Sequence, residues 1–262
     1  MKKAPGNLRS ALALGASEHI AIVGGGGKST LLFALARELR RQSLKVVTTT
    51  TTNVWLWERD QAPWALYLSE EASWENLLKE AVEKQGHVFV SREALSSGKA
   101  AGISKDMADA LFQEPWVEYL LVEADGAAGR PVKVPMPHEP VIPDSATAVI
   151  AVVGLDALGS ACTEKNVFRI DEFRKITGLK SQSRITPEAL VKIFAHRKGI
   201  FKESPEKARR IVFLNKSDIC EDLEEARILA QHIVQLPDAA VDRVVLGSLH
   251  NEEYNVILGE ER

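Results

Sequence analysis

Cysteine is scarce in this sequence of 262 residues, which contains only Cys162 and Cys220. Two isolated cysteines supply neither a disulfide framework nor a C-x-x-C zinc pattern, and such usage is typical of the reducing cytoplasm. Long hydrophobic runs are also missing, because the apolar stretch at residues 8–14 is too short and too interrupted for a signal peptide or a membrane span. We therefore expect a cytoplasmic protein that has no membrane partner.

An excess of basic residues is the third feature that the chain lacks. Its 33 lysines and arginines are balanced by 36 aspartates and glutamates, which gives a net charge of −3. Without a basic field, nucleic acid is not an expected partner. The apolar content of 45% is sufficient for a large core, and the length fits one α/β domain over residues 1–262.

A run of four glycines is the most informative stretch that is present. The β-branched residues 20–23 predict a strand and the apolar positions after Lys28 recur with helical spacing, so the glycines form a strand-to-helix loop. The backbone N–H groups of such a loop and the positive end of the helix dipole favour a phosphate chain. The residues expected to hold the phosphates are Gly24, Gly25, Gly26, Gly27, Lys28, Ser29 and Thr30.

The loop is a shortened form of the Walker A pattern G-x-x-x-x-G-K-[ST]. The first glycine of the full pattern would fall on Ile22, inside the predicted strand. An ordinary glycine-rich turn with an incidental lysine is therefore the alternative. We favour phosphate binding, because Gly-Gly-Lys-Ser has the required strand before it and helix after it.

A run of five threonines follows from the second predicted strand at residues 45–50. It continues past the carboxyl end of that strand, which is the edge where open parallel sheets bind ligands. We therefore expect Thr50 and Thr51 to turn their hydroxyl groups toward phosphate or Mg²⁺. The alternative is that threonine is present only because it favours strands.

An apolar run at residues 119–122 ends in Glu123, and Asp125 follows two positions later. Side chains two apart on a strand point the same way, so both carboxylates are expected near the loop-bound Mg²⁺. We predict Lys28, Glu123 and Asp125 as catalytic residues. The predicted metal ligands are Ser29, Glu123 and Asp125. The alternative is a pair of solvated acids before an ordinary Asp-Gly turn.

The segment at residues 127–143 is rich in proline, which blocks both a helix and an inner strand. We expect it to run extended over the surface, and a loop of this kind inside a compact domain is usually functional. Arg130 and Lys133 are candidates to contact anionic ligand groups. His138 and Glu139 are candidate acid/base groups or metal ligands, with an ordinary surface position as the alternative.

Further apolar runs, for example at residues 147–154, predict additional strands. With the helical patterns between them, they indicate an α/β fold built on a Rossmann-like, mostly parallel sheet with a phosphate loop. Residues 160–208 have helical patterns, and Thr186 followed by proline is a typical helix start. We expect these residues to form a small helical insertion before the C-terminal strands, with Arg169 near its beginning.

The sequence N-K-S-D at residues 215–218 directly follows an apolar run. It resembles the guanine-recognition motif N-K-x-D of GTP-binding proteins. The carboxylate of Asp218 would accept hydrogen bonds from the ring N–H and the exocyclic amine of guanine, whereas adenine would present an acceptor nitrogen to it. Asn215, Lys216 and Asp218 are therefore expected to bind the base. The alternative is that Asp218 caps the helix that follows.

Together, these stretches resemble the YqeC family. The resemblance is carried by V-G-G-G-G-K-S-T at 23–30, T-T-T-T-T-N at 48–53, V-E-A-D-G at 122–126, the proline-rich stretch at 130–143, G-L-D-A-L-G at 154–159 and L-N-K-S-D at 214–218. The resemblance implies a bacterial, cytosolic accessory protein that assists the maturation of a selenium-dependent molybdenum hydroxylase. It does not supply a reaction.

Two positions depart from the related patterns. The family pattern places histidine immediately before Arg169, whereas this chain has Phe168, so no role for that histidine is carried over. The shortened loop, the acid-ended strand and N-K-x-D also resemble the P-loop metallochaperone GTPases. Their signature lysine at the start of the loop is replaced here by Val23.

The leading hypothesis is a Mg²⁺-dependent nucleoside triphosphatase that uses GTP, with ATP as the alternative nucleotide. The family resemblance adds a coupling to the maturation of a selenium-dependent molybdenum hydroxylase or its cofactor. It also implies a hydroxylase or a cofactor-maturation protein as the partner. The competing hypotheses are a small-molecule phosphotransferase and a non-catalytic, nucleotide-gated accessory protein.

Overall fold

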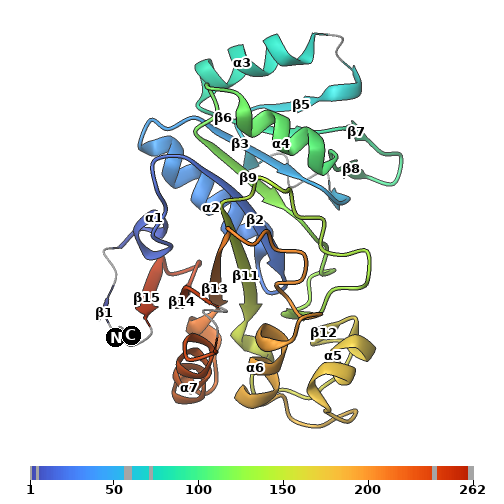
Figure 1. The fold of residues 1–262 in the computed structure, drawn as a ribbon, viewed down its shortest axis with the longest axis vertical. Helices are drawn as coiled ribbons and strands as arrows, with labels where there is room; N and C mark the ends of the chain where they lie inside the picture. The colour runs from blue at the N-terminus through green and yellow to red at the C-terminus, as the bar shows by residue number, and fades with distance from the viewer. Residues whose placement is uncertain (1, 4–5, 56–60, 71–72, 238–240, 259–262) are drawn as a thin grey trace.

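The computed structural model describes residues 2–3, 6–55, 61–70, 73–237 and 241–258. A ten-stranded sheet forms its centre, in the order β1-β15-β14-β13-β11-β2-β9-β3-β6-β5 (Figure 1). These strands are β1 (Lys2–Lys3), β2 (Glu18–Gly24), β3 (Val46–Thr50), β5 (Ala65–Tyr67), β6 (His87–Ser91), β9 (Tyr119–Glu123), β11 (Ala148–Gly154), β13 (Arg209–Asn215), β14 (Arg243–Ser248) and β15 (Glu253–Ile257). All neighbours from β14 to β5 pair in parallel, and β15 is antiparallel to β14 and β1. The predicted α/β fold with a mostly parallel sheet is confirmed.

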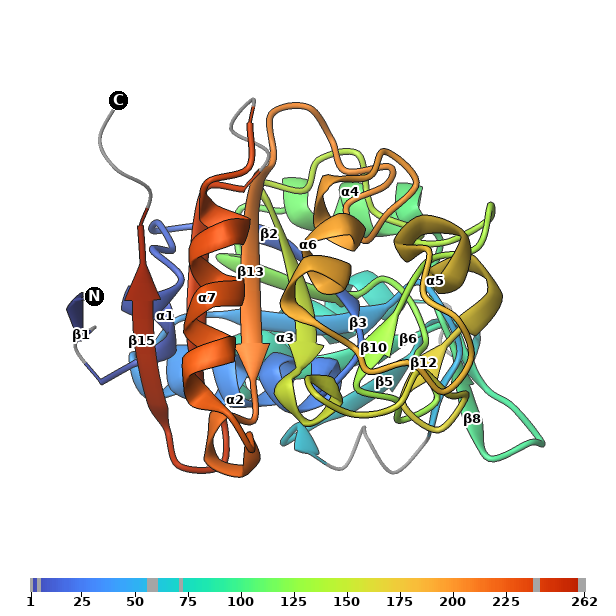
Figure 2. The same ribbon diagram turned by 90° about the horizontal axis from the view of Figure 1, so that it is seen from below.

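Helices cover both faces of the sheet, as Figure 2 shows from below. They are α1 (Leu8–Ala11), α2 (Lys28–Arg41), α3 (Trp74–Gln85), α4 (Lys105–Gln113), α5 (Ile170–Thr177), α6 (Pro187–Ala195) and α7 (Leu223–Val234). Alternation along β2 sets the two faces: Ile20 and Ile22 pack with α1 and α2, whereas Ala21 and Val23 face the layer of α5, α6 and α7. Helices α3 and α4 cover the rest of the face to which Ala21 and Val23 belong, over β9, β3, β6 and β5.

Residues 160–208 contain α5, α6 and the short strand β12 (Val167–Phe168), which pairs in parallel with β10 (Val132–Lys133). Apolar side chains of this segment, such as Phe173 and Leu190, belong to the same buried cluster as the strands β11 and β13. The segment is therefore packed directly on the sheet. The boundaries of the helical insertion, and the single domain over residues 1–262, stay a prediction.

The expectation that the proline-rich segment runs over the surface is wrong. Val132 and Val134 are fully buried in the cluster beneath α5 and α6, and Lys133 between them is 0% exposed. The segment can enter the core because β10 pairs with β12 only through Val132 and Lys133. Neither residue is a proline, so both can take part in a strand. This buried course brings the segment directly beside the end of β9.

A small three-stranded sheet follows β3 and was not predicted. Its order is β4-β8-β7, with β4 (Val54–Trp55), β8 (Lys99–Ala101) and β7 (Glu93–Ala94). The chain reaches β4 directly after the threonine run, and Gly102 lies against the backbone of Thr51 and Thr52. The small sheet therefore lies at the carboxyl end of β3, at the same edge of the main sheet as the glycine loop.

Candidate functional site

The glycine loop connects the carboxyl end of β2 to α2. Gly24, Gly26 and Gly27 have positive φ angles of 95°, 75° and 122°, which glycine adopts most readily. A Cβ atom on Gly26 would lie 2.1 Å from the backbone nitrogen of Gly154, and one on Gly24 would lie 2.4 Å from the carbonyl oxygen of Val152. The loop thus packs so tightly against the end of β11 that side chains at these positions are excluded.

The N–H groups of this loop fall into two sets. Those of Gly24, Gly25 and Gly26 donate to the carboxylate of Asp125 and to the carbonyl oxygens of Val152 and Arg130, at 3.2, 2.9 and 2.9 Å. The N–H groups of residues 27–30 have no acceptor within the described part of the chain, and α2 has no side-chain cap. The donors available to an anion therefore begin at residue 27, which differs from the expectation that residues 24–26 also donate to phosphate.

Lys28 is the first residue of α2, and its side chain folds back over the loop. Its Nζ atom donates to the carbonyl oxygen of Gly24 at 2.8 Å and lies 3.4 Å from Asp125 and 3.6 Å from Glu123. Burial lowers the pKa of the Lys28 ammonium, but the two carboxylates outweigh burial and hold this pKa above its usual value. Lys28 is therefore a stable cation beside the unpaired N–H groups.

Ser29 and Glu123 meet at the carboxyl edge of the sheet. The hydroxyl group of Ser29 donates to Glu123 at 2.7 Å, and Glu123 ends β9 directly beside β2. A hydroxyl and a carboxylate at one edge suit Mg²⁺, which binds few protein ligands and completes its octahedron with water and substrate phosphate. Within the described residues, no cluster of three or more histidine, cysteine, aspartate or glutamate residues could hold a metal. A metal at this edge would therefore depend on the phosphates.

Asp125 lies deeper than its predicted role as a metal ligand requires. Its side chain is buried, and its carboxylate accepts the N–H of Gly24 and pairs with Lys28 and Lys133. These contacts direct it toward the loop and the two lysines. The structure therefore places Asp125 behind the glycine loop, where it fixes the position of Gly24, while Ser29 and Glu123 remain at the open edge.

Lys133, a candidate to contact an anionic ligand, contacts groups of the protein instead. Its ammonium donates to the carbonyl oxygen of Gly126 at 2.6 Å and lies 3.2 Å from Asp125 and 3.0 Å from Glu139. These three oxygens surround an ammonium that is fully buried, so Lys133 is not accessible to a ligand. The alternation Val-Lys-Val turns the lysine to the face opposite the valines, and the sequence gives no signal that this face is buried as well.

Glu139 extends this chain of charges to Arg169, whose guanidinium lies 3.6 Å away. Burial raises the pKa of Glu139, but the charges of Lys133 and Arg169 outweigh burial and hold this pKa below its usual value. His138, the neighbouring candidate, is exposed. Glu139 is therefore an ionised carboxylate of the buried network, and His138 lies outside that network.

Thr50 and Thr51 use their hydroxyl groups inside the protein. Thr50 donates to the carbonyl oxygen of Glu123 at 2.9 Å, and Thr51 donates to that of Val141 at 2.7 Å. Each bond joins the end of β3 to a neighbouring segment, which the sequence alone does not reveal. The next residues, Thr52 and Asn53, are the ones that face the cavity described below.

Asn215 ties the predicted base motif to the glycine loop. Its amide donates to the carbonyl oxygen of Gly26 at 2.8 Å and accepts the N–H of Leu249 at 3.1 Å. Lys216 has a positive φ angle of 69° and pairs with Asp156 at 2.7 Å. The motif is thus held at the carboxyl end of β13, next to the loop.

Asp218 is exposed at the end of the same motif. The alternative that it caps the next helix is wrong, because the N-cap of α7 is Asp222, whose carboxylate accepts the N–H groups of Glu224 and Glu225. Asp218 is therefore exposed and is not the cap of α7, and neither Asp218 nor Asn215 lines the cavity described below.

One cavity of about 800 Å³ joins most of these residues, a size typical of ligand pockets. It is lined by Gly26, Gly27, Lys28, Ser29, Thr30, Thr52, Asn53, Val54, Trp55, Lys99, Glu123, Gly126, Ala127, Ala128, Gly129, Arg130, Glu139, Phe168, Arg169 and Lys216. Gly24, Gly25, Thr50, Thr51, Asp125 and Lys133 lie behind this lining. The cavity therefore brings the loop, the acid of β9 and one end of the base motif to a common space.

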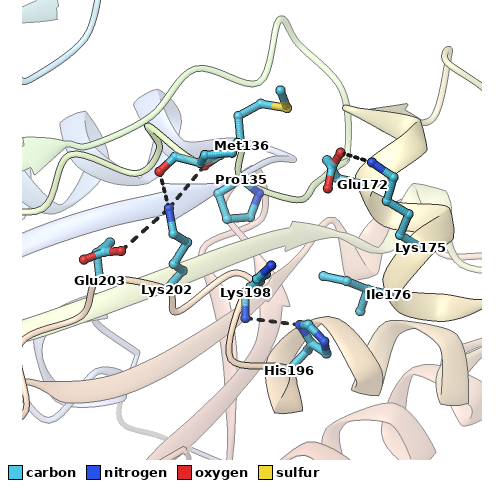
Figure 3. A pocket seen from close by; sticks show the side chains of 10 residues that line it. Pro135, Met136, Glu172, Lys175, Ile176, His196, Lys198, Lys202 and Glu203 are labelled. Carbon is cyan, nitrogen blue, oxygen red and sulfur yellow. Dashed lines mark hydrogen bonds and ion pairs between the residues drawn. The ribbon is translucent and has the colours of Figure 1, made fainter.

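A separate cavity of about 390 Å³ lies on the outer side of the proline-rich segment. Figure 3 shows Pro135 and Met136 facing α5 and the turn that carries Lys202. The ammonium of Lys202 donates to the carbonyl oxygens of Met136, Pro137 and Glu139. Lys202 therefore fixes the turn that presents Glu139 to the buried network.

The helices of the described residues include none that is both long enough and apolar enough to cross a membrane.

Comparisons with known proteins agree with the motifs. A family model described as YqeC protein matches residues 20–171, which contain the glycine loop, Glu123 and the proline-rich segment. A protein of Escherichia coli (strain K12), described as uncharacterized protein YqeC, is 36% identical over 222 residues, or 82% of this chain and 84% of that protein. The crystal structure of hydrogenase maturation factor HypB from Archaeoglobus fulgidus has a TM-score of 0.41 at 17% identity, over 94% of this chain and 88% of that chain. On the family model and the Escherichia coli relative, the chain belongs to the YqeC family.

Proposed function

We propose that this protein binds a nucleoside triphosphate together with Mg²⁺ and hydrolyses it. One observation carries the proposal: the four unpaired N–H groups of residues 27–30 open into the same cavity as Lys28 and the Ser29–Glu123 pair. Backbone donors, a fixed ammonium and a hydroxyl beside a carboxylate are the groups that a Mg²⁺-bound triphosphate needs.

The chain's own groups would act mainly by position and charge. The N–H groups of residues 27–30 and the ammonium of Lys28 would stabilise the charge that develops on the transferred phosphoryl group. Ser29 and Glu123 would hold Mg²⁺, which neutralises the phosphate oxygens when it is bound. Asp125 would keep Gly24 in place, and Arg130 is a candidate for a further contact with the phosphoryl group, because it lines the same cavity.

The proposed nucleotide is GTP, and ATP is the alternative. Support comes from the exposed carboxylate of Asp218 and from Asn215, which fastens the base motif 2.8 Å from the carbonyl oxygen of Gly26. A base held there would lie near a triphosphate held at α2, because Lys216 of the motif lines the same cavity as Gly27 and Lys28. Guanine offers two donors to one carboxylate, which adenine does not.

The cellular role that we propose follows the family. Membership in the YqeC family supports a cytoplasmic accessory protein that assists the maturation of a selenium-dependent molybdenum hydroxylase or its cofactor. The partner would then be that hydroxylase or a cofactor-maturation protein. A phosphotransferase and a nucleotide-gated binding protein without turnover are the competing functions for the same cavity.

A titration of the purified protein tests these alternatives. GTP and ATP are added with and without Mg²⁺, and tryptophan fluorescence and released phosphate are followed. Mg²⁺-dependent binding of GTP with release of phosphate to water is the expected result. Binding without turnover, even with the partner present, would favour the gated protein, and phosphate found on a small molecule would favour the phosphotransferase. If neither nucleotide binds, the proposed function is wrong.

A further inference from the structure

The terminal phosphate of a bound nucleotide would lie at one particular part of the cavity. The base motif follows β13, and the sheet order from there is β13, β11, β2, β9. A nucleotide with its base at β13 and its phosphates at the start of α2 therefore points its last phosphate toward β9. At the end of β9, the cavity wall consists of Glu123 and residues 126–130. The groups that can distinguish a triphosphate from a diphosphate belong to this part of the wall.

Arg169 reaches the same part of the wall from the layer of α5 and α6. The ammonium of Lys133 donates to the carbonyl oxygen of Gly126 at 2.6 Å. Glu139 lies 3.0 Å from this ammonium, and the guanidinium of Arg169 lies 3.6 Å from Glu139. Both Glu139 and Arg169 line the cavity. Three short contacts therefore connect the guanidinium of Arg169 to Gly126, just beyond the end of β9.

The guanidinium of Arg169 has N–H groups available for a ligand. It donates no hydrogen bond to the described residues of the chain, and its distance of 3.6 Å from Glu139 is longer than a hydrogen bond. It lies 4.6 Å from the centre of the Phe168 ring, which supports it from one side. Arg130, another arginine of the wall, already donates to two backbone carbonyl oxygens. Arg169 can therefore turn to an anion without giving up a hydrogen bond.

The backbone at Arg169 is consistent with a ligand contact by its side chain. This residue joins β12 to α5 and has φ and ψ angles of 64° and 51°. The left-handed conformation is unfavourable for residues other than glycine. Where it occurs in other residues, it is frequent at ligand-binding sites, because the surrounding structure holds it there. The side chain of Arg169 is thus placed at the cavity by a backbone that favours glycine.

We propose that Arg169 binds the terminal phosphate of the nucleotide and makes the protein prefer a triphosphate to a diphosphate. The guanidinium turns from Glu139 to the phosphate oxygens, with which it forms two parallel charge-assisted hydrogen bonds. Glu139 stays paired, because Lys133 and the N–H of Met136 still contact it at 3.0 and 3.2 Å. This inference rests on the proposed function and deepens it, because it names the residue that recognises the third phosphate.

Calorimetric titration with Mg²⁺ and either GDP or a non-hydrolysable GTP analogue tests this role, because only the analogue has a terminal phosphate. Arg169→Gln should lower the affinity for the analogue about tenfold and change that for GDP less than about twofold, since one charge-assisted contact is lost. Arg169→Lys keeps the charge without the planar fork and should give an intermediate value. The matched control Arg174→Gln, exposed on α5, should bind both nucleotides like the wild type.

Three outcomes separate this inference from the proposed function. If the wild type binds both nucleotides and Arg169→Gln lowers both affinities equally, or neither, Arg169 does not contact the terminal phosphate and the proposed function stands. If Arg130→Gln alone lowers the preference for the analogue over GDP, the contact belongs to Arg130 and this inference is overturned. If the wild type binds neither guanine nor adenine nucleotides, the proposed function is wrong and this inference fails with it.

Two provisions keep the comparison decisive. If the protein selects ATP, the same measurements are made with ADP and a non-hydrolysable ATP analogue. If Arg169→Gln does not fold, as judged by circular dichroism, Arg169→Lys replaces it, and a preference equal to that of Arg174→Gln would overturn the inference.

Discussion

The glycine loop and the proline-rich segment each place a buried lysine against the same carboxylate. Lys28 on the loop lies 3.4 Å from Asp125, and Lys133 on the segment lies 3.2 Å from it. Lys28 also borders the cavity, and it has one carbonyl acceptor and a second carboxylate, Glu123, at 3.6 Å. Lys133 likewise has one carbonyl acceptor and a second carboxylate, Glu139, at 3.0 Å, but it is 0% exposed and does not line the cavity. One lysine is thus free to exchange a protein partner for a ligand, and the other is committed to the fold.

The comparison shows that residue type and distance do not decide the role of a buried cation. Its access to the cavity decides it. Lys28 can leave the carbonyl oxygen of Gly24 for a phosphate without exposing Asp125, because Lys133 and the N–H of Gly24 still hold that carboxylate. The following changes test this division of roles, from the largest expected effect to the smallest.

Lys133→Met should have the largest effect on stability. It leaves Asp125 and Glu139 buried without the cation between them, and breaking a buried ion pair from one side costs about 3–5 kcal/mol of unfolding free energy. Urea denaturation followed by circular dichroism measures this loss. The matched control Lys84→Met, at an exposed position of α3, should stay within about 0.5 kcal/mol of the wild type. If Lys133→Met loses no more unfolding free energy than the control, Lys133 does not have the structural role assigned to it here.

Lys28→Ala should reduce nucleotide affinity more than it reduces stability. We expect the affinity for a nucleoside triphosphate to fall by about 100-fold, or about 2.7 kcal/mol, because a charge-assisted contact with phosphate is lost. The unfolding free energy should fall by less than in Lys133→Met, since Asp125 keeps Lys133. Calorimetric titration and urea denaturation of both variants give the two numbers. If the two variants lose nucleotide affinity and unfolding free energy in the same ratio, the two lysines do not have different roles.

Asp218→Ala is expected to change selectivity alone. Its carboxylate is exposed, so stability should not change, whereas the preference for GTP over ATP should fall about tenfold if the two guanine donors lose their acceptor. Competition between GTP and ATP for a fluorescent nucleotide analogue measures the preference. An unchanged preference would refute guanine recognition by this motif.

Lowering the pH should restore part of the unfolding free energy that the Lys133→Met variant loses. In the wild type, Lys133 and Arg169 outweigh burial and hold the pKa of Glu139 below its usual value, so its stabilising contribution is complete above pH 4.5 and is lost as the pH falls. Without Lys133, burial raises the pKa of Glu139, and the variant gains stability relative to the wild type as this carboxyl group takes up a proton. Between about pH 7 and about pH 5, we therefore expect the deficit to shrink. Urea midpoints at both pH values measure it, and a deficit that grows instead would contradict the charge network.

The sequence predicts the parts of the site that depend on local order along the chain. The strand, glycines and helix around Lys28 and the acid at the end of β9 follow from periodicity and from spacing. The roles of Lys133, Thr50 and Asp125 depend on which distant carbonyl or carboxylate lies opposite, as the bond from Thr51 to Val141 illustrates. Proline predicts a surface course for the segment at residues 127–143, whereas Val132 and Val134 carry it into the core.

The amide of Asn215 has a consequence for how a nucleotide is sensed. One side chain touches the phosphate loop through Gly26 and the last strands through Leu249. If phosphate bound to the loop and displaced it, the base motif would move with it, and by linkage a bound base would change the affinity for phosphate by the same factor. The affinity for inorganic phosphate should consequently change when a nucleoside is bound, and that change would be the coupling that this one amide transmits.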